Sequence, residues 1–141
     1  MGHKRFKIKA NESPYYPPGN PAHFWAFVFD TKQEMRDWYF KECEAAGKVP
    51  MECDFAAMFM PFQSVMFDKD GNLKMGDTIG NVIFYKGAIG AGIVAHEMGH
   101  CAFWYERLVN GNKSATFGKE VGDREERYLY LLHDFVGMFY Q

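Results

Sequence analysis

The sequence has few cysteines, and they do not form a pattern that would cross-link the chain. Its 141 residues include three of them, Cys43, Cys53 and Cys101, with no Cys-x-x-Cys pair. An odd and sparse set fits a reducing compartment better than a disulfide framework.

Long hydrophobic runs are also missing. No stretch of about 18 apolar residues is present that could span a membrane, and the first residues, MGHKRFKIKA, lack the apolar region of a signal peptide. We therefore expect a soluble cytoplasmic protein with no membrane partner, located in the host cytoplasm if the source is viral.

The chain carries no strong excess of charge. Its formal net charge is −2, and no basic stripe interleaves with the aromatic residues. Because nucleic-acid-binding domains show a clustered positive footprint, we expect no nucleic-acid partner. Aromatic residues, by contrast, reach 18%, which indicates a core of large side chains or a groove for a partner.

Length and patterning predict a single α+β domain over residues 1–141. Thr31 and Glu34 form a capping box before a helix that Gly47 ends. Pro61 places its strand at an edge or at a break. The expected strands cover residues 4–10, 23–30, 56–67 (one or two strands) and 80–87, and the expected helices cover 32–46, 90–108 and 124–140.

One short motif, HEMGH at residues 96–100, predicts chemistry. In an α-helix, residues i and i+4 share a face about 6 Å apart along the axis, so His96 and His100 can bind one Zn²⁺ at about 2.0–2.1 Å. Glu97 would lie beside the metal as the general base that takes a proton from water. Apolar flanks predict a largely buried helix, in which such polar groups would be costly without partners.

A catalytic zinc site needs a third protein ligand. The longer HExxHxxGxxH motif is absent, and Glu106 is expected to face away from the two histidines. The best candidates are Glu125 and Glu126, which open a helix 25 or 26 residues after His100. Either glutamate has a structural alternative, because Glu126 could cap the helix start and Glu125 could be a solvated charge favoured by the helix dipole.

HEMGH followed by an EERYLYLL helix resembles the gluzincin type of zincin metallopeptidase. It looks most like compact phage-encoded metallopeptidases and small intracellular peptidases that cleave phage-type repressors. In that pattern the ligand glutamate stands four residues before an aromatic residue, as Glu126 does before Tyr130. The resemblance therefore favours Glu126 as third ligand.

The resemblance also implies a fold and an activity. It implies a zincin-like domain, in which a small mixed or antiparallel sheet packs against the HEMGH helix and a C-terminal ligand-bearing helix. It implies zinc-dependent hydrolysis of a peptide or protein substrate. The substrate would pair with an edge strand that precedes the metal helix, a place that residues 81–87 occupy.

Other residues have weaker signals. His133 lies two turns beyond Glu126 and could donate a proton or a hydrogen bond to the reacting carbonyl. Gly90 and Gly92 either let the backbone approach substrate or allow tight helix packing, and the same alternatives apply to Gly87. Cys101 is expected to be a packing residue.

Two other functions stay open from the sequence. In the first, the metal holds two helices together and the aromatic surface binds a partner protein, as in a viral or regulatory interaction module. Structural zinc sites favour four protein ligands, however, and Glu97 would then have no task. The second is a deformylase-like amide hydrolase with Cys53 as a ligand, although the Gly-Cys-Leu pattern of deformylases is absent.

Overall fold

The computed structural model describes residues 3–9, 21–52, 54–61, 65–109 and 131–140. Residues 131–139 are helical and are named the C-terminal helix below. The other elements, in chain order, are β1 (His3–Ile8), β2 (His23–Phe29), α1 (Lys32–Ala45), β3 (Ala57–Pro61), β4 (Val65–Phe67), β5 (Leu73–Met75), β6 (Thr78–Tyr85), the short 3-10 helix η1 (Lys86–Ala88) and α2 (Ala91–Val109).

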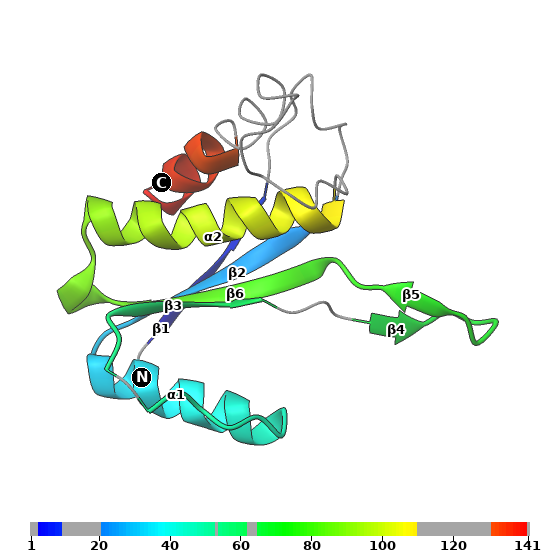
Figure 1. The fold of residues 1–141 in the computed structure, drawn as a ribbon, viewed down its shortest axis with the longest axis horizontal. Coiled ribbons are helices and arrows are strands. Elements are labelled where there is room, and N and C mark those ends of the chain that lie inside the picture. The colour runs from blue at the N-terminus through cyan, green and yellow to red at the C-terminus, as the bar shows by residue number, and fades with distance from the viewer. Residues whose placement is uncertain (1–2, 10–20, 53, 62–64, 110–130, 141) are drawn as a thin grey trace.

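Four strands form one mixed sheet in the order β1-β2-β6-β3. The pair β2–β6 is parallel, and the outer pairs β1–β2 and β3–β6 are antiparallel. Helix α1 covers one face of this sheet, and α2 with the C-terminal helix covers the other (Figure 1). The prediction of an α+β fold with a small mixed sheet is therefore confirmed.

Each face of the sheet has its own apolar core. On the α2 face, Phe24 and Val82 pack with Met98 and Phe135. On the α1 face, Phe27 and Ile83 pack with residues of α1. The inner strands are buried on both faces, which explains why they read as continuous apolar runs rather than as alternating patterns.

The ends of α1 follow the local signals in its sequence. The backbone N–H of Glu34 donates to Thr31 Oγ1 at 3.2 Å, and Gly47 has a φ of 68° just after the helix. A left-handed conformation at this position favours glycine. The prediction of a helix over 32–46 is confirmed by α1 at Lys32–Ala45.

The segment at 56–67 forms two strands, β3 and β4, and β4 pairs with β5 in a small separate hairpin. Asp68 Oδ1 accepts hydrogen bonds from the backbone N–H groups of Asp70 and Asn72, which close the turn between β4 and β5. The hairpin projects away from the four-stranded sheet (Figure 1). The three-residue strand β5 was not predicted.

The prediction that residues 81–87 form the edge strand is wrong. Residues 81–85 belong to β6, which pairs with β2 on one side and β3 on the other, and residues 86–87 belong to η1. A run such as Val82-Ile83-Phe84, all of it buried, is typical of an inner strand. The edge beside α2 is instead β3, and Pro61 at its end agrees with the edge position predicted for that proline.

Helix α2 confirms the prediction of a helix over 90–108. Trp104 Nε1–H donates to the carbonyl oxygen of Ile79 at 2.8 Å, which ties α2 to the start of β6. Among the described residues, no helix has the length and apolarity needed to cross a membrane.

Candidate metal centre

The two histidines of HEMGH converge on one side of α2. His96 Nε2 and His100 Nε2 are 3.3 Å apart, and the rings meet nearly at right angles, at 82°. Two ligands at 2.0–2.1 Å from a tetrahedral metal would be separated by about 3.3–3.4 Å. The distance also suits a hydrogen bond between neutral rings. The pair therefore has the separation that a shared metal requires.

The histidines lie on the exposed face of α2, contrary to the expectation of a largely buried motif. The His96 side chain is 68% exposed, and His100 is also exposed. The buried face of α2 is formed instead by residues such as Val94, Met98 and Cys101. Both imidazoles can thus be reached by a ligand, and the cost of burial applies to Glu97 alone.

Glu97 is the buried member of the motif. Its residue is 7% exposed, its Oε1 lies 4.0 Å from His96 Nε2, and its Oε2 is buried without a hydrogen-bond partner among the described residues. Burial raises the pKa of this carboxyl, and His96 opposes the rise. A carboxylate with a raised pKa is a better base, so the buried side chain suits proton transfer.

Strand β3 positions one of the histidines. The ring of Phe59 stacks on the ring of His100, with centroids 6.0 Å apart and planes within 6°. Burial and the neighbouring His96 both lower the pKa of His100. Since only the neutral imidazole binds metal, this environment favours the ligand form. The sequence showed no signal for the contact, because Phe59 and His100 belong to distant elements.

The third ligand lies outside the described residues. Both candidates, Glu125 and Glu126, fall in residues 110–130, so their position stays a prediction. Within the described parts of the chain, no three side chains of His, Cys, Asp or Glu come together as a metal-binding group. Glu106 is fully buried, which agrees with the prediction that it faces away from the exposed histidines.

His133 lies on the C-terminal helix, with its side chain 85% exposed and its Nδ1 3.5 Å from Asp134 Oδ1. It lines a shallow depression together with Ala95, the residue before His96. The depression includes neither His96 nor His100, so no contact of His133 with the histidine pair is seen in the described residues. Its catalytic role stays a prediction.

The cysteines and glycines complete the predicted set. Cys101 is fully buried and burial raises the pKa of its thiol, so the prediction of a packing role is confirmed; Cys53 lies outside the described residues. A Cβ added at Gly90 or Gly92 would meet no described atom within 4 Å, so neither glycine is required by tight packing against the described residues. A Cβ at Gly87 would come within 3.2 Å of the Tyr85 ring.

Gly80 on β6 packs closely against the strand that carries Phe59. The sequence analysis did not identify this glycine. A Cβ added at Gly80 on β6 would come within 3.2 Å of Phe59, of Phe24 and of the carbonyl oxygen of Met60. Such a contact is tighter than ordinary packing. Gly80 therefore allows the close approach of β3 and β6 that places Phe59 beneath His100.

Comparisons with protein-family models, with curated proteins and with solved structures find no match to this chain.

Proposed function

We propose that this protein is a zinc-dependent peptidase in which His96 and His100 bind the metal and Glu97 is the general base. The observation that carries the proposal is the convergence of the two Nε2 atoms at 3.3 Å beside a buried carboxylate.

The residues present fit a zinc ion. The two Nε2 atoms supply nitrogen ligands, and Glu126, with Glu125 as the alternative, would complete a His₂Glu set, which leaves one coordination position open. The unpartnered Oε2 of Glu97 has no structural task in the described residues. Such a group at a buried position is costly, and a catalytic role explains why it is present.

Zinc, when bound, lowers the pKa of a coordinated water from 15.7 to about 7 and polarises a carbonyl group. Glu97 Oε1, 4.0 Å from His96 Nε2, would accept the proton of the attacking water. The same carboxyl then delivers that proton to the leaving amine nitrogen, and returns to its charged state. His133 would donate a hydrogen bond to the developing oxyanion.

Strand β3 is the best candidate for pairing with substrate. It is an edge strand of the four-stranded sheet, and the ring of its Phe59 stacks on His100. An extended peptide that adds to β3 by backbone hydrogen bonds would therefore pass beside the histidine pair. This replaces the assignment of residues 81–87 that the resemblance had implied.

The test is the pair of variants Glu97→Gln and Glu42→Gln, the second being a matched change at an exposed residue of α1 on the opposite face of the sheet. Glu97→Gln should retain zinc and fold but lose at least about 100-fold of the cleavage rate on an unfolded protein substrate. Glu42→Gln should cleave as the parent does. Unchanged cleavage by Glu97→Gln would contradict the proposal.

Metal analysis addresses the ligands separately. Protein purified without chelators should contain about one zinc per chain, and His96→Ala should lose it. Of Glu125→Ala and Glu126→Ala, the variant that loses zinc identifies the third ligand. A parent protein that binds no zinc, or a His96→Ala variant that binds it as well as the parent, would rule out the proposed centre.

A further inference from the structure

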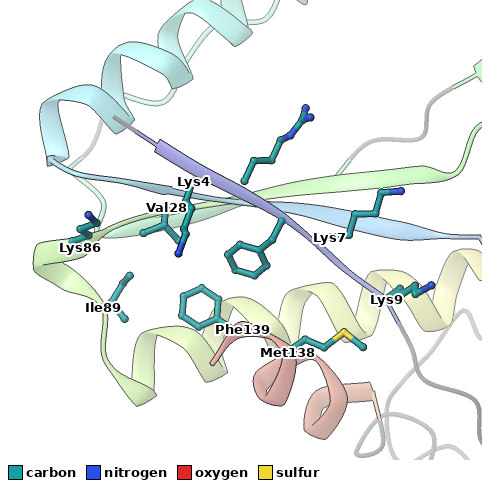
Figure 2. Close-up of a pocket in the computed structure, with 10 residues that line it drawn as sticks. Lys4, Lys7, Lys9, Val28, Lys86, Ile89, Met138 and Phe139 are labelled. Atoms are coloured by element: carbon teal, nitrogen blue, oxygen red, sulfur yellow. The ribbon is translucent and has the colours of Figure 1, made fainter. Parts of the chain in front are cut away.

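A second candidate binding site lies at the other edge of the sheet. A cavity of about 700 Å³ opens between β1, the region of η1 and the C-terminal helix (Figure 2). Cavities of roughly 300–1,000 Å³ are the usual size of small-molecule sites. The proposed peptidase reaction makes no use of this cavity.

The floor of the cavity is apolar and is anchored to the core. Phe6 and Phe139 contact each other with ring centroids 5.7 Å apart, and Phe139 also packs on Phe84 of β6 at 4.7 Å. Val28 and Ile89 contribute aliphatic surface on the same side. Because these residues belong to β1, β2, the segment after η1 and the C-terminal helix, the floor is formed before any ligand binds.

The rim of the cavity is positively charged. Lys4 and Lys86 lie at the end beside Val28, and Lys9 lies at the end beside Met138 (Figure 2). Lys86 Nζ is neutralised by Asp30, at 2.6 Å. Lys4 and Lys9 make no ion pair with any described residue, so two free ammonium groups face an apolar floor in a chain whose net charge is −2.

Two other cations of β1, Arg5 and Lys7, also line the cavity, but their charged ends lie over the ring of Trp25. The guanidinium carbon of Arg5 lies 4.2 Å from the ring centroid of Trp25, and Lys7 Nζ lies 5.4 Å from the same centroid. Figure 2 shows the Lys7 side chain directed away from the cavity, on the opposite side of β1 from Phe139. Alternation along the strand thus separates the cavity-facing Lys4 from Lys7.

We propose that this cavity binds a small amphipathic carboxylate, a single-chain molecule with an anionic head and an apolar tail. The head pairs with Lys4, which lies on the same face of β1 as Phe6. The tail lies on Phe6, Val28 and Phe139. An uncharged apolar molecule would leave the free ammonium groups unused, and a purely polar anion would leave the apolar floor uncovered.

The test is calorimetric titration of the full chain with decanoate below its micelle concentration. We expect one site per chain, with octanoate bound about tenfold more weakly because two fewer CH₂ groups are buried and decanol bound at least about fivefold more weakly because it lacks the charge. An acidic peptide without a hydrocarbon tail should bind more weakly than decanoate.

Matched variants locate the site. Lys4→Met keeps the apolar stem but removes the charge, and should weaken decanoate about fivefold; Lys7→Met, the same change on the opposite face of β1, should change binding less than about twofold. Far-ultraviolet circular dichroism checks that both variants fold. Absent decanoate binding, decanol binding as tightly as decanoate, equal effects of the two variants, or tighter binding of the acidic peptide would each overturn the proposal.

Discussion

The two edge strands of the sheet have opposite chemistry. β1 reads HKRFKI and presents three cations and a histidine in six residues, whereas β3 reads AMFMP and carries no charge. Charged side chains, lysine above all, keep other strands from pairing with an edge, while an uncharged edge invites pairing. The difference indicates that β3 is the edge available to an extended peptide, and that the cations of β1 serve another purpose.

The charged side chains near the two edges also differ in how far they are buried. Beside β3, the carboxylate of Glu97 is buried and one of its oxygens has no described partner. Beside β1, the cations of Lys4 and Arg5 are exposed. A site that buries an unpartnered charge lowers stability in exchange for reactivity, and Glu97 beside β3 is such a group among the described residues.

The strongest test of this comparison replaces one phenylalanine with alanine on each of the two edge strands. Phe59 on β3 and Phe6 on β1 are both half-buried against the α2-side core. Phe59→Ala and Phe6→Ala should each lower the free energy of unfolding by about 2 kcal/mol, less than the 3–5 kcal/mol typical of fully buried phenylalanines. Denaturation in urea measures this loss.

Only one of the two variants should affect the metal. Phe59→Ala removes the ring that stacks on His100 and should weaken zinc about tenfold, as loss of a supporting contact around a ligand does. Phe6→Ala should leave zinc affinity within about twofold. Competition with a chromogenic chelator gives both values, and equal zinc affinities for the two variants would show that the edges do not differ in this way.

A smaller effect is expected from the buried carboxylate itself. In metal-free protein at neutral pH, Glu97→Gln should raise the free energy of unfolding by about 1 kcal/mol, because the charge is removed although a buried polar group remains. The exposed Glu42→Gln should change it by less than about 0.5 kcal/mol. Thermal or urea unfolding in the presence of a chelator measures both.

The stabilisation expected from Glu97→Gln should depend on pH. Burial raises the pKa of Glu97 in the folded state above its ordinary value of 4.5, so the folded protein binds more protons than the unfolded chain between the two pKa values. The destabilisation by Glu97 is therefore absent below the unfolded pKa and grows as pH rises through the folded one. A stability difference between parent and Glu97→Gln that persists unchanged at low pH would contradict this account.

Local signals in the sequence predicted the elements that local interactions determine. Helix α1 begins at a Thr31 cap and ends before Gly47, and both features lie within a few residues of the helix they bound. The convergence of His96 and His100 follows in the same way from the helical repeat. Pro61 indicated an edge strand or a break, because proline lacks the backbone donor that a central strand needs.

Strand order and contacts between elements were not predictable in this way. Residues 81–87 were expected at the edge, yet β6 is an inner strand, because order depends on pairings between segments far apart in the chain. The stacking of Phe59 on His100 and the close approach at Gly80 have the same origin. The zincin resemblance and the third ligand at Glu126 stay predictions.

The smallest expected effect concerns the cations of β1 that lie over the ring of Trp25. Arg5 lies over the Trp25 ring at 4.2 Å, so a double-mutant cycle of Arg5→Met and Trp25→Leu should give a coupling of about 0.5–1 kcal/mol, as for exposed cation–π pairs. The matched cycle of Lys4→Met and Trp25→Leu should give a coupling near zero, because Lys4 belongs to the opposite face of the strand. Equal couplings in urea denaturation would mean that the strand does not sort its cations by face. A coupling confined to Arg5 would show that Arg5 packs on the Trp25 ring while Lys4 stays available to a ligand. The cations of β1 would then have two separate roles, and the uncharged β3 has no counterpart to either.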